Sequence, residues 1–323
     1  MKNKLFYMVT LLFACFSLPV HSVMTPGDNI VSEEKKLQVG ISLVDLSNPF
    51  FSILAKEISN EMKKDVAGNV DVFIRSSAYD LTRQVAQLNK FIKDGVDILF
   101  IAASETEAIA PVIKMAREQG VIVAAVDIEA VGTDISVSSD NFQAGSMACG
   151  YLAEQLSGQG KVAIINGSPI SSVIHRVEGC RDNLKHYPQI QLVSYQHNSS
   201  GTFSGGLESM TYLLLEYPDL DGVFAINDPS ALGAEEATRQ MNNRRALITS
   251  VDASPQVLER LISDDTNLIA SVAQFPRAMA RNAVKLALER LSGQFQEQKT
   301  TLIPTKLVTK GNADKFSQWQ ELK

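Results

Sequence analysis

Three apolar runs decide the fold: IVAAVD at Ile122–Asp127, VFAIN at Val223–Asn227 and LITSVD at Leu247–Asp252. Each run is short, rich in β-branched residues and ends at a hydrogen-bonding side chain. Such runs are typical of strands buried on both faces, as in parallel sheets that helices cover. Because ligands of open α/β sheets bind beyond the carboxyl ends of the strands, we expect these end residues to form one polar site for a small molecule.

Local structure offers an alternative explanation for the same three residues. Asp and Asn commonly begin turns, since their side chains hydrogen-bond to nearby backbone groups. The repetition of the pattern at three strand ends favours the ligand site over three unrelated turns.

The composition describes an ordinary globular protein of two domains. The chain has 323 residues, 45% of them hydrophobic, and a formal net charge of -6. Typical domains hold roughly 100 to 200 residues. No basic run is present to bind phosphates, so nucleic acid is not an expected partner.

The N-terminus resembles a secretory signal peptide. A basic start, MKNK at Met1–Lys4, precedes an apolar stretch from Leu5 to about Leu18 and small or polar residues up to Ser22. We therefore predict a signal peptide over residues 1–22, cleaved near Ser22, and a disordered remnant over 23–36. A membrane anchor would need ~20 apolar residues, and this stretch is shorter, which disfavours an anchor.

A lipoprotein cleavage box is a second interpretation of the leader. The sequence LFAC would leave a lipidated Cys15 at the new N-terminus. The bulky Phe13 and the shortened apolar stretch disfavour this interpretation.

Cys149 and Cys180 are the two thiols that remain after cleavage of the leader. In an exported protein an even pair can form a disulfide. Each Cys also occupies an apolar helical pattern, where free Cys behaves as a small core residue. We favour buried free thiols over the disulfide.

Strands and helices alternate along the chain, which indicates βαβ units and a parallel sheet. The predicted first half has strands at 37–44, 70–75, 98–102 and 121–126, and helices at 50–64, 81–93 and 106–118. The same alternation returns from 142 to 251, so we predict two doubly wound, Rossmann-like lobes. A tail of helices 256–263 and 277–291, strand 269–272 and an extended stretch 302–308 has too many elements for the second lobe alone. Some of it should return to the first lobe and form a hinge.

Motifs for catalysis or cofactor binding are missing from the sequence. There is no GxGxxG after the first strand, no phosphate-binding loop and no GxSxG. His175, His186 and His197 are not at metal-ligand spacing. We therefore expect no cofactor, no metal and no enzymatic activity.

The chain resembles the periplasmic sugar-binding proteins of the ribose-binding type, with the periplasmic binding protein-like I fold. The resemblance runs from about Leu37 to Val308, and its motifs are SNPFF at 47–51, VD at 126–127, SDN at 139–141, AIND at 225–228, ALGA at 231–234, VD at 251–252 and AQFP at 273–276. It implies a periplasmic location and two lobes that close on a ligand. It also implies crossovers near Ser139, Gln274 and Pro304, with one lobe at 37–139 plus 275–303 and the other at 140–274 plus 304–323.

The resemblance also implies ligand-binding residues in both lobes. They are Asn48, Phe50, Phe51, Asp127, Arg176, Phe203, Asn227, Asp252 and Gln274. The aromatic rings would pack against the apolar face of a sugar, and the polar groups would bind its hydroxyls. One of the two adjacent rings, Phe51, has the spacing of an ordinary core residue, and Arg176 could instead be a surface residue of its helix.

Three departures argue against ribose itself. Ile128 follows Asp127 where ribose-binding members carry Arg, Ala102 replaces an Asn, and the loop at 202–205 ends in Gly205 with no Arg. A site that loses hydrogen-bond donors changes which compound fits. We expect a deoxy, smaller or less hydroxylated ligand.

The leading hypothesis is a monomeric periplasmic receptor that closes on a sugar or polyol and presents it to the permease of an ABC-type importer. An alternative is a ligand-sensing component that docks on a chemoreceptor or on the ectodomain of a sensor histidine kinase. An enzyme on the same scaffold is a third, less favoured possibility.

Overall fold

The computed structural model describes residues 35–243, 245–316 and 319. The predicted signal peptide at 1–22 and Cys15 lie outside these residues, as does most of the predicted remnant at 23–36. No helix in the described ranges is both long enough and apolar enough to cross a membrane.

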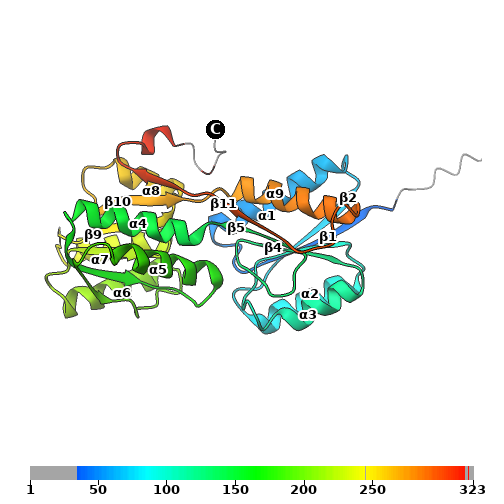
Figure 1. Ribbon diagram of the computed structural model, residues 1–323, viewed down its shortest axis with the longest axis horizontal. Helices are drawn as coiled ribbons and strands as arrows, with labels where there is room; N and C mark the ends of the chain where they lie inside the picture. The colour runs from blue at the N-terminus through cyan, green and yellow to red at the C-terminus, as the bar shows by residue number, and fades with distance from the viewer. Residues whose placement is uncertain (1–34, 244, 317–318, 320–323) are drawn as a thin grey trace, which may run out of the picture. The chain divides into compact units, whose positions relative to one another are not determined.

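The first lobe is built on a parallel sheet with the strand order β11-β5-β4-β3-β1-β2. Its strands are β1 (Leu37–Leu43), β2 (Val70–Ser76), β3 (Ile98–Ile101), β4 (Ile122–Val126), β5 (Ile135–Ser139) and β11 (Lys299–Ile303). Its helices are α1 (Pro49–Asp65), α2 (Leu81–Lys93), α3 (Ala110–Glu118) and α9 (Pro276–Leu291). Helices α1 and α9 cover one face, and α2 and α3 cover the other (Figure 1).

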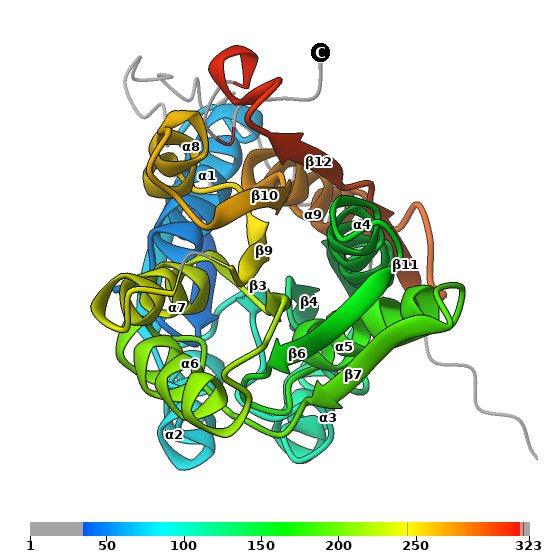
Figure 2. The same ribbon diagram turned by 90° about the vertical axis from the view of Figure 1, so that its left-hand side faces the viewer.

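The second lobe has a similar sheet with the strand order β12-β10-β9-β8-β6-β7, in which β12 is antiparallel to β10 and the other neighbours are parallel. Its strands are β6 (Gln159–Ile165), β7 (Gln189–Ser194), β8 (Gly222–Ala225), β9 (Leu247–Asp252), β10 (Leu268–Ala273) and β12 (Lys306–Thr309). Its helices are α4 (Asn141–Gln155), α5 (Ser171–Leu184), α6 (Phe203–Glu216), α7 (Asp228–Gln240) and α8 (Pro255–Ile262), with a 3-10 turn at Ala313–Lys315. Helices α4 and α5 lie on one side of the sheet, and α6 and α7 lie on the other (Figure 2).

Three segments connect the lobes. The chain crosses from β5 to α4, returns from β10 to α9, and crosses again from β11 to β12. The segments are tied together, because the Asp140 amide donates to the Ile303 carbonyl at 2.9 Å and the Thr305 amide donates to Gln143 Oε1 at 2.9 Å. The predicted fold class, two doubly wound lobes with a three-segment hinge, is confirmed.

The last extended stretch differs from its prediction. Residues 302–308 form the end of β11 and most of β12, which lie in different sheets and are separated by Pro304 and Thr305. The predicted helix at 106–118 begins only at Ala110, with Pro111 in its first turn, where proline is best tolerated.

Cys149 and Cys180 form a disulfide between α4 and α5, so the preference for free thiols was wrong. Both residues are fully buried, as expected for core residues. The two helices cross closely because glycines stand at the crossing. A Cβ on Gly145 would lie 1.9 Å from the Arg176 carbonyl oxygen, and one on Gly179 would lie 2.0 Å from that of Phe142. This approach brings the two Cys Cα atoms to 5.1 Å, within disulfide reach.

Candidate functional site

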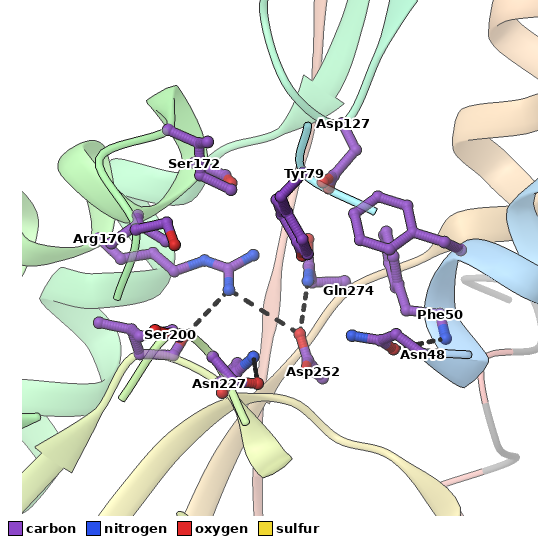
Figure 3. Close-up of a pocket in the computed structure, with 16 residues that line it drawn as sticks. Asn48, Phe50, Tyr79, Asp127, Ser172, Arg176, Ser200, Asn227, Asp252 and Gln274 are labelled. Atoms are coloured by element: carbon purple, nitrogen blue, oxygen red, sulfur yellow. Dashed lines mark hydrogen bonds and ion pairs between the residues drawn. The ribbon is translucent and has the colours of Figure 1, made fainter. Parts of the chain in front are cut away.

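A pocket opens between the lobes, beyond the carboxyl ends of the strands in both sheets. This is where open α/β sheets bind ligands. Residues from both lobes line it: Asn48, Phe50, Phe51, Tyr79, Asp127, Ser168, Ile170, Ser172, Val173, Arg176, Ser200, Gly201, Ile226, Asn227, Asp252 and Gln274 (Figure 3).

The structure brings together eight of the nine predicted site residues. They are Asn48, Phe50, Phe51, Asp127, Arg176, Asn227, Asp252 and Gln274. Their roles toward a ligand stay predictions, but their common location is an observation. The three residues that end the apolar runs therefore do meet, as the strand pattern predicted.

Phe203 does not line this pocket, and in this respect the prediction was wrong. It is the first residue of α6, directly after the N-cap Thr202, and 47% of its surface is exposed. It lines a separate surface pocket beside Leu232. Ser200 and Gly201 form the nearby pocket wall, so this loop contributes no aromatic ring there.

Arg176 is buried and is held by two hydrogen bonds within its own lobe. Its Nε donates to Asn141 Oδ1 at 2.8 Å, and its Nη1 donates to the Ile226 carbonyl at 2.9 Å. The guanidinium points into the pocket (Figure 3). Because Nη2 makes no hydrogen bond to another described residue, it is free to donate to a ligand. The alternative of a surface Arg is excluded by an exposure of 5%.

Asp127 follows β4 and is 4% exposed. Its Oδ1 is buried with no hydrogen-bond partner among the described residues. Burial raises the pKa of Asp127 to about 6, and the positive charge of Arg176 opposes that rise. The backbone has a φ of 66° at this residue, a left-handed conformation that Asp tolerates better than most residues.

Asp252 is the last residue of β9, at the corresponding sheet edge of the second lobe, and it also has a positive φ (128°). Its Oδ1 accepts from Gln274 Nε2 at 2.7 Å, and its carbonyl oxygen accepts from Trp319 Nε1 at 2.7 Å. Burial, followed by the neighbouring carboxylate of Asp228, raises the pKa of Asp252 to about 7. The carboxyl group is thus held rigidly at the pocket wall.

Asp228 holds the carboxylate of Asp252 in place. The sequence analysis did not identify Asp228 as a residue that supports the site. Its backbone amide donates to Asp252 Oδ2 at 3.3 Å. Its fully buried carboxylate accepts from the hydroxyls of Ser250 and Ser271 at 2.6 and 2.7 Å and from the Ser254 amide at 2.6 Å. Asp228 therefore ties β9, β10 and the start of α8 together behind the site.

Two buried acceptors of the pocket have no donor in the described part of the chain. They are Asp127 Oδ1 and Gln274 Oε1. Buried polar atoms almost always have a hydrogen-bond partner, and an unpaired one costs about 1–3 kcal/mol. A ligand that carries hydroxyl donors would satisfy both atoms.

The two predicted Asn residues are also helix N-caps. The alternative explanation, that such residues hydrogen-bond to nearby backbone groups, therefore also holds for them. Asn48 Oδ1 accepts from the Phe50 amide at 3.0 Å and begins α1. Asn227 Oδ1 accepts from the Ser230 amide at 3.1 Å, and its Nδ2 donates to the Gly201 carbonyl at 3.0 Å. The Nδ2 of Asn48 makes no hydrogen bond within the described residues, which leaves it able to donate to a ligand.

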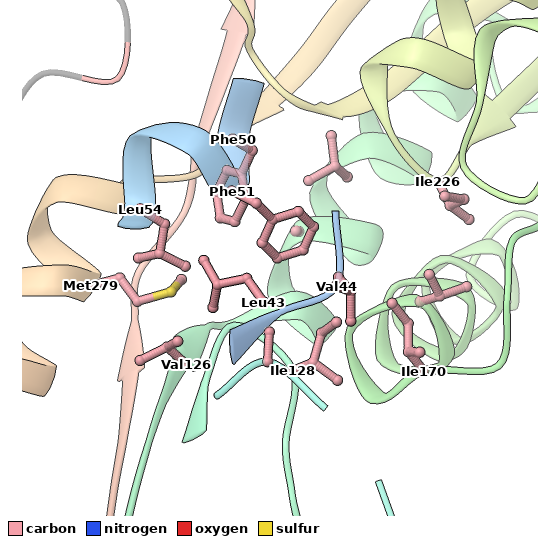
Figure 4. Close-up of a cluster of buried hydrophobic side chains, with 14 of the residues drawn as sticks. Leu43, Val44, Phe50, Phe51, Leu54, Val126, Ile128, Ile170, Ile226 and Met279 are labelled. Carbon is pink, nitrogen blue, oxygen red and sulfur yellow. The ribbon is translucent and has the colours of Figure 1, made fainter. Parts of the chain in front are cut away.

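Phe50 and Phe51 line the pocket and also belong to the core. Their rings are 5.3 Å apart and nearly perpendicular, and Phe50 also contacts the ring of Trp319 at 6.2 Å. Beneath them lie apolar side chains that include Leu43 and Leu54 (Figure 4). Phe51 is therefore a core residue, as its spacing predicted, and also lines the pocket.

Several lining residues escaped the sequence analysis because they lie in loops without periodic pattern. Tyr79 follows β2, Ser168 and Ile170 follow β6, and Ser200 lies before α6. The rule that identified Asp127 could have found Tyr79, since β2 ends at the same sheet edge.

The lobes also contact each other away from the hinge. The backbone amide of Glu129, in the loop after β4, donates to Ser171 Oγ at the start of α5, at 2.9 Å. Glu129 follows the lining residue Asp127 by two positions, and Ser171 directly precedes the lining residue Ser172. In residues 35–243, 245–316 and 319, no group of three or more His, Cys, Asp or Glu residues is arranged to hold a metal ion.

Comparison with known proteins gives a consistent result. A family model described as a periplasmic binding protein domain matches residues 39–295. The chain is 32% identical over 278 residues to the ribose import binding protein of Bacillus subtilis, covering 85% of this chain and 88% of that protein. It is 25% identical over 244 residues to the xylitol-binding protein of Mycolicibacterium smegmatis, covering 74% and 68%. The crystal structure of the Caulobacter myo-inositol binding protein bound to myo-inositol superposes with a TM-score of 0.79 at 26% identity, covering 87% and 96%.

Proposed function

Because the chain belongs to the periplasmic binding protein family, we propose that it is a receptor that closes on a monosaccharide-like ligand and delivers it to an ABC-type sugar importer. The receptor is exported by the signal peptide at 1–22 and works in the periplasm. It binds its ligand and releases it unchanged.

One observation carries this proposal. Two buried acceptors, Asp127 Oδ1 and Gln274 Oε1, have no donor among the described residues and lie in a pocket that also holds the buried guanidinium of Arg176. Acceptors and a cation from both lobes, beside the rings of Phe50 and Phe51, match a molecule with hydroxyls at its rim and an apolar face.

The relatives support a polyhydroxy ligand without naming one. Their names specify ribose, xylitol and myo-inositol. Ribose itself is disfavoured, because Ile128 and Ala102 are fully buried apolar residues outside the pocket lining. Gly205 has no room for a side chain, since a Cβ there would lie 2.0 Å from the Ser199 carbonyl oxygen.

The test begins with the compound that the protein retains during purification. The protein is exported with its own signal peptide, purified and denatured. The small molecules that it releases are identified by mass spectrometry. Titration calorimetry with that compound and a panel of four- to six-carbon sugars and polyols then gives the affinities.

Asp127→Asn serves as the binding-defective variant, and the exposed Asp219→Asn as its matched control. Binding of a sugar or polyol that Asp127→Asn weakens and Asp219→Asn does not supports the proposal. A purified, folded protein that binds no member of the panel and retains no compound would overturn it. Uptake of the compound is then measured in cells that lack the gene. Lost uptake supports delivery to an importer, and unchanged uptake supports the sensing alternative.

A further inference from the structure

Tyr79 projects into the middle of the pocket from the loop between β2 and α2. It lines the pocket together with Asp127, Arg176 and Asp252 (Figure 3). Among the described residues that line the pocket, the aromatic ones are Phe50, Phe51 and Tyr79. Only Tyr79 among them carries a hydroxyl, and it comes from a different element.

The backbone of this loop is strained to hold Tyr79 in place. Ala78 and Tyr79 have φ values of 53° and 57°, so two consecutive residues other than glycine are left-handed. Such conformations are energetically unfavourable for residues that carry a Cβ. They persist only where the surroundings fix them, and such strain is concentrated at functional sites.

The surroundings of the loop supply this restraint. The Ser77 amide donates to the Leu43 carbonyl at 2.9 Å, and the Tyr79 amide donates to the Val44 carbonyl at 3.2 Å. The hydroxyl groups of Ser77 and Ser104 are hydrogen-bonded to each other at 2.9 Å. The loop is thus tied to β1 and to the end of β3, which directs the side chain of Tyr79 into the gap between the lobes.

The phenol lies within the field of the site's charged groups. Tyr79 as a whole is 39% exposed, but burial of its phenol raises the pKa of Tyr79 above its ordinary value. The carboxylates of Asp45, Asp127 and Asp252 raise it further, while Arg176 opposes them. The hydroxyl therefore stays protonated and can donate. It makes no hydrogen bond to another described residue.

The opposite lobe leaves a gap in the aromatic lining. Phe203 is exposed and does not line the pocket, and its loop contributes the small groups Ser200 and Gly201 to the wall. Tyr79, from the first lobe, therefore supplies an aromatic ring to a pocket in which the described lining residues of the second lobe include none. The same ring occupies room in the middle of the pocket.

We propose that Tyr79 determines ligand specificity: its hydroxyl donates to the ligand, and its ring excludes a further hydroxymethyl group, so that four- and five-carbon polyols are preferred over hexoses. This inference rests on the proposed function, since it concerns the same site. It names the size class of ligand that the site selects.

The test compares two substitutions by titration calorimetry against four-, five- and six-carbon polyols and myo-inositol. Tyr79→Phe removes the hydroxyl alone, and roughly a 3- to 10-fold loss of affinity for the best compound is expected from one hydrogen bond. Tyr79→Asn shortens the side chain with a residue that tolerates left-handed backbone. It should shift the preference toward six-carbon compounds.

Tyr212→Phe is the matched control, because Tyr212 is 54% exposed on α6 and outside the pocket. Thermal unfolding of each variant checks that it is folded. Unchanged affinity in Tyr79→Phe together with an unchanged size ranking in Tyr79→Asn would overturn the inference while leaving the proposed function intact. A wild-type protein that binds no sugar or polyol would overturn both.

Discussion

Arg176 Nη1 lies 3.9 Å from Asp252 Oδ1, and both side chains are more than 90% buried at the pocket wall. This ion pair joins α5 to the end of β9 within the second lobe. Asp127 and Asp228 are two further buried carboxyl groups of this region. Burial is the main cause that raises the pKa of all three acids, the charge of Asp228 adds to the rise at Asp252, and Arg176 opposes the rise at Asp127 and Asp252.

Arg176→Lys should weaken ligand binding about 10- to 100-fold. Lysine keeps the charge but cannot bond Asn141 and Ile226 while also donating to a ligand. Charge-assisted hydrogen bonds are worth about 1.5–3 kcal/mol each. Titration calorimetry measures the loss, and Arg181→Lys, an exposed position on the same helix, is the control. Equal affinities in the two variants would contradict this role for Arg176.

Ligand affinity should rise with pH by at least about tenfold between pH 5 and pH 8. Hydroxyl donors favour the ionised carboxylate. In the ligand-free protein Asp127 has a pKa of about 6 and Asp252 one of about 7. At pH 5 a group with a pKa of about 6 is only about one tenth ionised, so binding must release protons. Calorimetry in two buffers of different ionisation enthalpy counts these protons. An affinity that is flat or falls over this range would rule the explanation out.

The stability of the ligand-free protein should change in the opposite direction. The folded-state pKa values of Asp127 and Asp252 lie above the unfolded value of about 4. The folded state therefore holds more protons between about pH 4 and pH 7, and its free energy of unfolding falls as pH rises through that window. Asp127→Asn should reduce this dependence, which urea unfolding at several pH values detects.

Ser171→Ala should lower ligand affinity about 3- to 10-fold and leave ligand-free stability nearly unchanged. The substitution removes the acceptor for the Glu129 amide, a hydrogen bond between the lobes that we expect closure on a ligand to require. Ligand dissociation followed by stopped-flow fluorescence should be faster. The exposed Ser204→Ala is the control, and a loss of thermal stability as large as the loss of affinity would point to a role within one lobe.

Loss of the disulfide should lower the free energy of unfolding by about 3–4 kcal/mol. Cys149 and Cys180 are separated by 31 residues, and closing a loop of that length restricts the unfolded chain by this amount. Guanidinium unfolding compares the wild type, with and without dithiothreitol, with the Cys149→Ala/Cys180→Ala variant. Dithiothreitol should weaken the wild type and have no effect on the double variant; equal stability of all samples would refute the prediction.

The sequence by itself determined the alternation of strands and helices and the edge at which the site forms. Runs such as Ile122–Asp127 are apolar throughout because both faces of their strands are covered. Their direction alone places Asp127 and Asp252 at the carboxyl ends of the two sheets. Local chemistry also determined the helix starts, since Asn48 and Asn227 cap α1 and α7.

Only the tertiary structure decided which neighbouring side chains share the pocket. Tyr79 lies in the loop after β2 and lines the pocket, whereas Phe203, the first residue of α6, is exposed and lies outside the lining. The pairing of Cys149 with Cys180 depends on a helix crossing that two glycines permit, and Trp319 reaches Asp252 across 67 positions of the chain. Such contacts join segments far apart in sequence, and the periodicity of one segment carries no information about the side chains of another.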